Sequence, residues 1–345
     1  MRFLACSLLL VSAHAFAASK IDPAGAAEAQ ILRGNVLVWH DATLFAEPSE
    51  TARTLQLATF DAARKHRVGH VVPMKVIAGK GPFIEVELAG DEDCTWSRVV
   101  VPDDLARVRM FVRRADLAPV LVKSFTKTFE DGTSISLDVG TPLVATDANT
   151  YVVSLHGDEL EVDVPATSVG HAYVPKKSAG VIAAGQTLAI AAATKATLGG
   201  RALSLTAWKG GPIEKRADHA VVAIEERCVT AHVIVPSKAL ADVDDSTLDV
   251  GTSSGGSSIM NLRGECYLPR LTPLSIGERQ VAVAAKPIYL HAEPTGKHAC
   301  IHRAIRIESA LEIKRTDEKL RICAPAANVA REVARSARSR GAAHR

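Results

Sequence analysis

Apolar and polar residues alternate in short runs along most of this chain, and the runs end at glycines and prolines. Clear cases are GPFIEVEL from residue 81, ELEVDVP from 159 and HAVVAIEE from 219. A period of two puts successive side chains on opposite faces of an extended strand, so each run predicts a half-buried β-strand. Only the final segment, AANVAREVARSARSRGAAHR, has a helical period. The pattern predicts an all-β protein with a short C-terminal helical tail.

Three phrases recur and indicate repeated modules. The first is a strand stopped by a proline, TLFAEPSE at 43–50 and YLHAEPTG at 289–296. The second places a glycine bend before a strand, in LDVGTPLVA from 137, IAAGQTLAI from 182 and LSIGERQVAV from 274. The third phrase occurs as MFVRRADL from 110, AYVPKKSA from 172 and HVIVPSKAL from 232. Its valines, Val112, Val174 and Val235, fall 62 and 61 residues apart. That spacing is the size of one small β-barrel.

Together these phrases resemble the bacterial Src-homology-3-like (SH3-like) domain. LFAEPSE resembles its first strand and turn, LDVGTPLVA its Leu-x-x-Gly-Thr strand, CTWSRV at 94–99 its Trp-bearing strand and YVPKK at 173–177 its closing turn. The resemblance implies tandem small β-barrels and ligands such as peptidoglycan or peptide segments. The chain departs from the family in its aromatic content, which is 4% of all residues.

The phrases divide the chain into units. We expect a signal peptide at 1–17, a linker at 18–33, SH3-like units at 34–120, 121–179 and 180–243, a Ser/Gly-rich linker or loop at 244–268, a fourth unit at 269–328 and a basic tail at 329–345. The tail carries five arginines against one glutamate, so it is either a solvated end or a contact to an anionic envelope polymer.

The first residues, MRFLACSLLLVSAHAFAAS, combine Arg2, a short apolar run and small residues at alternate positions. This is the pattern of a secretory signal peptide, with cleavage after Ala15 or Ala17. No later run reaches the ~18 apolar residues of a membrane helix, so we expect no membrane span. The mature protein is then exported, to the periplasm or beyond. Nucleic acid is an unexpected partner for an exported chain with few aromatic residues.

An exported chain meets an oxidising compartment, where disulfides form. Five cysteines follow the predicted signal peptide, an odd number, so at least one is free or pairs outside the chain. Cys300 and Cys323 flank adjacent strand-like segments of one unit, and we predict that they form a disulfide. The pairing of Cys94, Cys228 and Cys266 stays open.

Two patterns suggest hydrolase sites, but the residues next to them do not fit that chemistry. LDVGT occurs at 137–141 and again at 248–252, which would give Asp138 and Asp249 as an aspartic-protease dyad. The residues after them are Val139 and Val250, which cannot supply the bracing hydroxyl groups, so both copies are interpreted as strand-turn pieces. GTSSG places Ser253 in a Gly-x-Ser-x-Gly pattern, but no helix is predicted after it, so a Ser/Gly-rich linker is favoured.

Two histidine patterns suggest metal binding. HACIH places His298, Cys300 and His302 on one face of a strand, with His291 as the nearest further candidate ligand for zinc. A bridged cysteine on a surface strand is favoured over a metal site. His66 and His70 are spaced for one helix face but are interpreted as loop residues.

These observations favour an exported, non-catalytic binding or structural protein of the bacterial cell envelope, without a cofactor. Its expected partner is a cell-wall polymer or an envelope protein, and the sequence favours no oligomeric state. The alternative is an envelope hydrolase, or a protein with a weak metal site around His298. No segment outside the units is large enough for a separate catalytic domain, which favours binding.

The signal-peptide prediction is testable on the native protein. We expect the mature chain to begin at residue 16 or 18 and to be found outside the cytoplasm, because the Ala-x-Ala pattern places cleavage there. N-terminal sequencing of protein purified from its source measures this directly. A mature chain that begins at Met1 would contradict the prediction.

Overall fold

A computed structural model describes residues 30–58, 67–88, 94–155, 157–175, 188–190, 193–205, 208–210, 212–242, 266–290, 293–309 and 318–331. Regular structure in these ranges is β-strand, apart from 3-10 turns at Arg114–Asp116, Ala166–Ser168, Ser237–Ala239 and Ala326–Asn328. The prediction of an all-β protein is therefore confirmed. Within the same ranges, no helix is both long enough and apolar enough to cross a membrane.

The first sheet is built from the N-terminal part of the chain. Its order is β1 (Asn35–Trp39), β4 (Val71–Ala78), β5 (Phe83–Glu87), β8 (Arg109–Arg113), β2 (Thr43–Phe45) and β3 (Thr54–Gln56), and all pairs are antiparallel. β1 is buried on both faces, because Val36 and Val38 join one core cluster while Leu37 and Trp39 join another. A strand covered on both sides has a continuous apolar run rather than an alternating one.

A second sheet combines two short strands near residue 100 with strands of the C-terminal part of the described chain. Its order is β6 (Ser97–Val100), β28 (His298–Ser309), β29 (Glu318–Pro325), β25 (Pro273–Ile276), β26 (Arg279–Ala284) and β7 (Leu105–Ala106). The pairing therefore joins the range expected as the first unit to the range expected as the fourth. Ion pairs across this junction join Arg98 to Glu308 at 2.9 Å and Arg279 to Glu85 at 2.9 Å.

A third sheet lies in the middle of the sequence. Its path is β10 (Phe125–Thr128), β11 (Ser134–Leu137), β22 (Val229–Pro236), β17 (Thr194–Leu198) and β18 (Arg201–Leu205), with β21 (His219–Glu226) paired to β22 and β20 (Pro212–Lys215) paired to β21. β11 pairs with β22 over four residues, from Ser134 opposite His232 to Leu137 opposite Val229. The pairing thus also crosses the boundary expected at 179/180.

Four smaller sheets complete the described part of the chain. They contain β12 (Val144–Ala145), β13 (Thr150–Leu155) and β14 (Asp158–Asp163); β9 (Val120–Leu121) and β15 (Val169–Gly170); β16 (Leu188–Ile190), β19 (Trp208–Gly210) and β23 (Leu240–Asp242); and β24 (Cys266–Leu268), β27 (Ile288–Leu290) and β30 (Ala330–Arg331).

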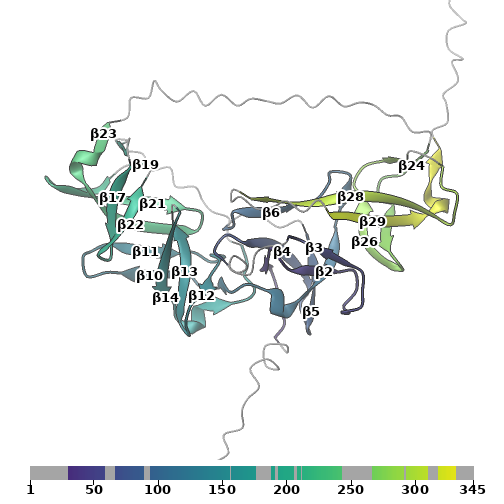
Figure 1. The fold of residues 1–345 in the computed structure, drawn as a ribbon, viewed down its shortest axis with the longest axis horizontal. Helices are drawn as coiled ribbons and strands as arrows, with labels where there is room; N and C mark the ends of the chain where they lie inside the picture. Colours follow the sequence, from purple (N-terminus) through teal and green to yellow (C-terminus); the bar gives the residue numbers. More distant parts are fainter. Residues whose placement is uncertain are drawn as a thin grey trace, which may run out of the picture.

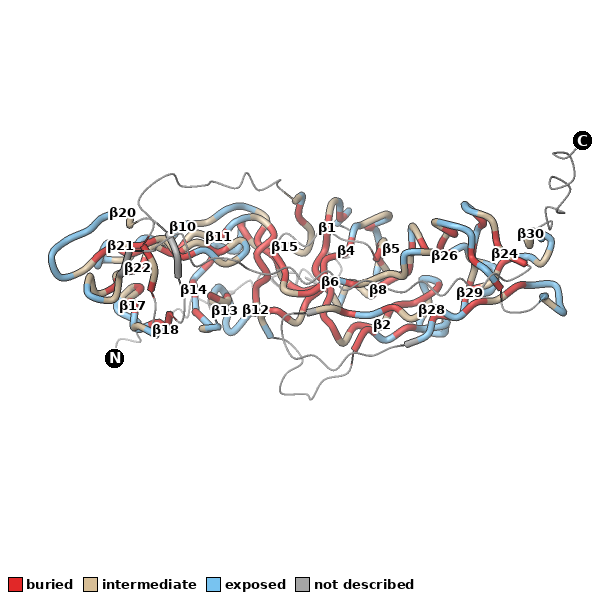
Figure 2. Tube along the Cα trace, turned by 90° about the horizontal axis from the view of Figure 1, so that it is seen from above, coloured by how far each residue is buried: buried red, intermediate tan, exposed pale blue. Residues whose placement is uncertain are grey.

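The molecule is elongated and has two lobes (Figure 1). One core cluster contains residues of the first sheet and of the C-terminal strands, and a second is formed by residues between Leu121 and Val235. Buried residues run along the interior of both lobes, with exposed residues at the hairpin ends (Figure 2). Each lobe therefore has its own hydrophobic core, assembled from segments distant in sequence.

A disulfide joins the two lobes. It links Cys94, which lies just before β6, to Cys228 in the hairpin turn between β21 and β22, a separation of 134 residues. Beside it, the Arg227 guanidinium lies over the Trp96 ring, 5.1 Å from the ring centroid. The buried Cys266 is the free cysteine among the described residues, in agreement with the odd number of cysteines.

Several predicted segments lie outside the described residues. They are the signal peptide at 1–17 and nearly all of the Ser/Gly-rich stretch at 244–268. The predicted helical tail at 329–345 is not seen: only its first three residues are described, and Ala330–Arg331 form β30. β30 pairs with β24, so this part of the tail extends a sheet.

His40 is a buried titratable group at the end of β1. Its side chain is fully buried and its ring stacks on that of His70, with centroids 5.9 Å apart. Burial, and to a smaller extent the nearby His70, lowers the pKa of His40 to about 3. His40 is therefore neutral in the folded protein at neutral and mildly acidic pH.

We predict an acid-dependent loss of stability that originates at His40. The unfolded chain takes up a proton at this histidine near its ordinary pKa of 6.5, whereas the folded protein does so only near 3, so stability falls as the pH drops through this window. The expected loss is on the order of 3 kcal/mol between pH 7 and pH 4. Urea unfolding at a series of pH values gives the slope of the free energy of unfolding against pH, which counts the protons taken up on unfolding. We expect this number to be smaller by about one in His40→Asn than in the wild-type protein. An unchanged slope in the variant would contradict the prediction.

Candidate functional site

A groove of about 630 Å³ lies beside β28. Its wall on one side is β27, its end is the turn at 293–296, and its floor is the first half of β28. The lining includes Tyr289, Glu293, His298, Cys300, His302 and Arg303. This volume falls within the usual range for a small-molecule or peptide-segment site.

Alternation along β28 divides its side chains between two faces, and residues of both faces line the groove. Ala299, Ile301 and Ile305 point into the core, so His298 and His302 are exposed and Cys300 is half-buried on the opposite face. The expectation that HACIH presents its polar residues on one face of a strand therefore agrees with the structure.

The register with β29 completes this outer face. Opposite His298, Cys300, His302 and Ala304 stand Pro325, Cys323, Arg321 and Lys319, respectively. Residues directly opposite in an antiparallel pair share a face, so this surface carries two histidines and two cationic side chains, and none of its eight residues is acidic. Its charge favours an anionic ligand.

Two ion pairs border the groove. Glu293 pairs with Arg331, which connects the turn at 293–296 to β30. Arg303 pairs with Asp104 at 2.7 Å, which connects β28 to the loop before β7. These contacts leave Arg321 as a cation whose polar contact, within the described chain, is to the Cys300 sulfur at 3.8 Å.

An aromatic pair stands at the wall formed by β27. Tyr289 is 45% exposed and lies opposite Tyr267 across the β24–β27 ladder, with ring centroids 5.7 Å apart. The neighbouring ring restricts the conformations of Tyr289, so less entropy is lost when a ligand packs against it. Tyr289 is therefore a preformed contact surface.

Cys300 and Cys323, the pair predicted from the sequence, are joined by a disulfide. The bond removes Cys300 as a thiolate ligand for zinc, because metal binding needs the deprotonated thiol. Across the described ranges, no group of three histidine, cysteine or acidic side chains is arranged to hold a metal ion. His291 and His66, the other candidates, lie outside the described residues.

The first LDVGT copy forms a tight turn after β11. Asp138 is exposed and accepts a hydrogen bond from the Ser124 hydroxyl at 3.2 Å, while the Thr141 hydroxyl donates to the Asp138 carbonyl at 2.7 Å. The Asp138 amide also donates to the Cys228 carbonyl at 2.8 Å. The motif therefore anchors the turn that receives the inter-lobe disulfide, whereas Asp249 and Ser253 lie outside the described residues.

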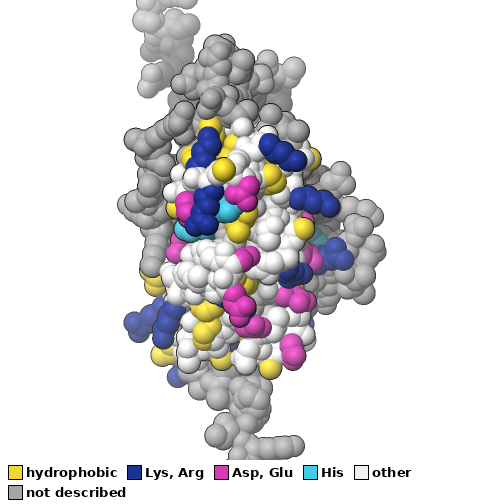
Figure 3. Space-filling model, turned by 90° about the vertical axis from the view of Figure 1, so that its left-hand side faces the viewer, with side chains coloured by type: hydrophobic (Ala, Val, Ile, Leu, Met, Phe, Trp, Pro, Cys, Tyr) yellow, Lys and Arg dark blue, Asp and Glu magenta, His cyan; other side chains and the backbone are white. Residues whose placement is uncertain are grey.

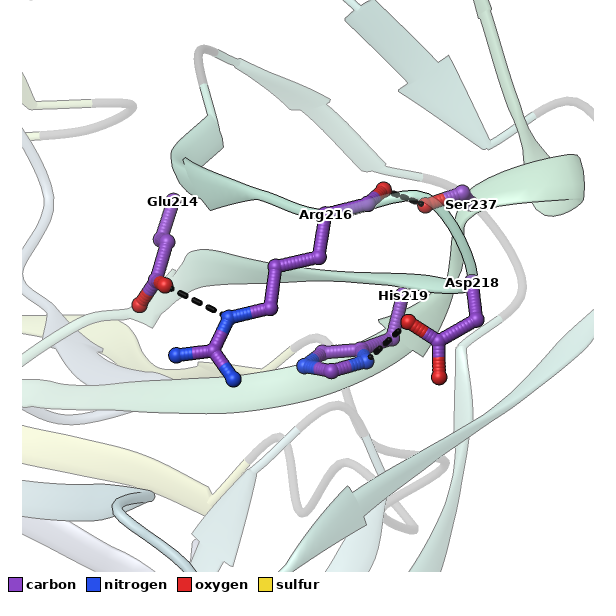
Figure 4. Close-up of polar contacts among 5 residues, drawn as sticks. All are labelled: Glu214, Arg216, Asp218, His219 and Ser237. Atoms are coloured by element: carbon purple, nitrogen blue, oxygen red, sulfur yellow. Dashed lines mark hydrogen bonds and ion pairs between the residues drawn. The ribbon is translucent and has the colours of Figure 1, made fainter.

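A serine, a histidine and an aspartate meet at the far end of the other lobe (Figure 4). His219 Nδ1 lies 2.8 Å from Asp218 Oδ1, and backbone hydrogen bonds together with this contact lower the pKa of the Asp218 carboxyl. The Ser237 hydroxyl, however, donates to the Arg216 carbonyl at 2.9 Å, and the free edge of the His219 ring faces the Arg216 guanidinium. The histidine does not activate the serine, so this is not a catalytic triad.

The surface at that end of the molecule mixes charges. In Figure 3, basic, acidic and hydrophobic side chains are interspersed over the described part of this face. Glu214 pairs with Arg216 at 2.7 Å, which neutralises both side chains locally. The groove beside β28 is therefore the stronger candidate for ligand binding.

The sequence had indicated only half of the groove. His298, Cys300 and His302 could be selected from their alternate spacing, but Tyr289 of the lining was missed, as was Arg321, which lies beside Cys300 outside the lining. A signal for Tyr289 was present, since it belongs to the repeated phrase YLHAEPTG. Arg321 is placed by the β28–β29 register, which a single strand pattern does not specify.

Comparisons with protein-family models, with curated proteins and with solved structures find no match for this chain.

The glycine of the first LDVGT copy gives a test of the turn. Gly140 has φ +98°, and an added Cβ would lie 2.8 Å from the Tyr173 ring and 2.9 Å from the Cys94 sulfur. We expect Gly140→Ala to destabilise the protein by about 2 to 4 kcal/mol, from backbone strain plus overpacking. Gly132→Ala is the matched control, because Gly132 also has positive φ but has nothing within 4 Å of the added atom. Equal midpoints in urea unfolding for the two variants would contradict this interpretation.

Proposed function

We propose that this chain is an exported, non-catalytic binding protein of the bacterial cell envelope, and that the groove beside β28 binds its ligand. The observation that carries the proposal is the combination of a preformed groove of about 630 Å³ with exposed Tyr289 at its wall. An aromatic ring in a concave site supplies packing area, and the nearby cations supply attraction for carboxylates.

Two features support the exported location. The described residues contain two disulfides, which persist in oxidising compartments, and they contain no helix suited to span a membrane. Both are compatible with an exported protein. The signal-peptide pattern at 1–17 supplies the route.

The bonding of the candidate nucleophiles favours binding over the hydrolase and metal alternatives. In the oxidised protein Cys300 is held in a disulfide, and in that state it is neither a nucleophile for hydrolysis nor a zinc ligand. In the grouping of Ser237, His219 and Asp218, the serine hydroxyl is bonded to a carbonyl, away from the histidine. The groove therefore supports recognition better than catalysis.

The proposed ligand is the peptide-bearing polymer of the cell wall. The SH3-like resemblance of the repeated phrases implies peptidoglycan or peptide ligands, and the groove chemistry agrees with such a ligand. His302 in the groove, with Arg321 and Lys319 on the adjoining face of β29, suits the carboxylates of its peptides, while Tyr289 suits packing against a sugar or an apolar peptide side chain.

The experiment is co-sedimentation of the purified mature protein with purified cell-wall sacculi. We expect saturable binding that Tyr289→Ala weakens about tenfold, the effect of losing one aromatic contact of moderate strength. Tyr289→Phe should retain most of the affinity, because the ring is kept. Ile213→Ala is the matched control, since Ile213 is 55% exposed but lies on β20 in the other lobe.

Two results would overturn the proposal. One is the absence of binding by the folded wild-type protein. The other is equal binding by the Tyr289→Ala and Ile213→Ala variants. A broad hydrolase screen on the same preparation tests the enzymatic alternative, and turnover of cell-wall material that depends on a groove residue would favour that alternative.

A further inference from the structure

The two disulfides of this protein lie in different surroundings. Cys94–Cys228 connects segments 134 residues apart, and the Cys94 side chain is 4% exposed. Cys300–Cys323 connects segments 23 residues apart, and both of its cysteines are half-buried, with Cys300 lining the groove. The first bond therefore joins the buried Cys94 to a half-buried Cys228, whereas neither cysteine of the second bond is fully buried.

The strands that Cys300–Cys323 joins are held together without it. β28 and β29 pair over eight residues, from His298 opposite Pro325 to Ile305 opposite Glu318. Beneath them, Ile301 and Ile322 are in the hydrophobic core, and β28 and β29 pair further with β6 and β25. Cleavage of the disulfide therefore leaves the ladder and the core contacts in place, so the bond can open without unfolding the sheet.

The surroundings of the bond favour a thiolate. A guanidinium nitrogen of Arg321 lies 3.8 Å from the Cys300 sulfur, and His302 stands opposite Arg321 on the same face. Nearby cations stabilise a cysteine thiolate relative to the thiol, which makes it both a better leaving group and a more abundant nucleophile. None of the eight residues at the four pairs around this bond is acidic, and Glu293, the acidic residue of the groove lining, is paired with Arg331.

We propose that Cys300–Cys323 is a thiol–disulfide exchange site whose partner is a peptide or protein segment carrying two thiols. A thiolate of the partner enters the groove and attacks the Cys300 sulfur, the bond between the two cysteines breaks, and Cys323 leaves as a thiolate. The second thiol of the partner then attacks the partner's own sulfur in the mixed disulfide and releases Cys300. The partner loses two electrons and two protons and gains a disulfide, and Cys300 and Cys323 are reduced to a dithiol.

Attack is assigned to Cys300 because it is the cysteine of this pair that lines the groove. Thiol exchange needs access of the nucleophile to one sulfur along the line of the bond, and the groove provides that access. This inference does not depend on the cell-wall ligand proposed above, because it concerns only the accessibility and electrostatics of the sulfurs.

The first test uses the oxidised full-length mature protein in buffers of reduced and oxidised glutathione. After acid quenching and alkylation, peptide mapping gives the redox state of each pair. We expect Cys300–Cys323 to be reduced at a concentration of reduced glutathione at least tenfold lower than that needed for Cys94–Cys228. Reduction of both pairs at the same concentration, or of Cys94–Cys228 first, would overturn the proposal.

The second test measures the reactivity of the Cys300 thiol itself. In a Cys266→Ser/Cys323→Ser background, Cys300 is the thiol that remains outside the inter-lobe disulfide. We expect it to react with the aromatic disulfide 5,5′-dithiobis(2-nitrobenzoic acid) at pH 7 about tenfold faster than glutathione does. A rate equal to or below that of glutathione would count against the site.

Arg321→Gln in the same background tests the cation directly. We expect a several-fold slower reaction and a pH–rate midpoint moved to higher pH, because the thiolate loses its nearest positive charge. Arg306→Gln is the matched control, since Arg306 is also exposed on β28 but lies six residues from Cys300. Equal pH–rate profiles for the two variants would show that Arg321 does not stabilise the thiolate, and this would overturn the assigned mechanism.

Discussion

The pairing of β6 and β7 with the C-terminal strands is the interaction on which the arrangement of this molecule depends. β6 pairs with the end of β28, from Ser97 opposite Ser309 to Val100 opposite Arg306, and β7 pairs with β26. This pairing merges the N-terminal sheet and the C-terminal strands into one hydrophobic core. Just before β6, Cys94 is bonded to the other lobe. The short stretch from Cys94 to Ala106 therefore connects all the larger parts of the described chain.

The position of the groove follows from the same pairing. β28 is twelve residues long, and its two halves have different roles. The second half is fixed to β6 and reinforced by the ion pair between Arg98 and Glu308, while the first half projects beyond β6 and forms the groove floor. These pairings hold the groove floor in place, and a preorganised binding surface loses less entropy when a ligand binds.

Local sequence patterns predicted where strands occur, but they did not predict which strands pair with each other. β5, β14 and β21 could be predicted because one face of each is buried, which leaves a period of two in the sequence. The pairing of β11 with β22 could not, because a period of two identifies the buried face of a strand but not the strand beside it. The same reason explains the site: the face of β28 that carries His298 and His302 was predictable, whereas Arg321 is placed opposite His302 only by the ladder.

The wide separation of paired segments has a consequence for the order in which the chain acquires its structure. β6 can find β28 only after some two hundred further residues have emerged, and the closure of such a long loop is entropically costly and slow. A chain of this kind stays incompletely folded while it is being synthesised. That property is compatible with an exported protein, because the contacts that complete the fold, including the bond between Cys94 and Cys228, join segments more than a hundred residues apart.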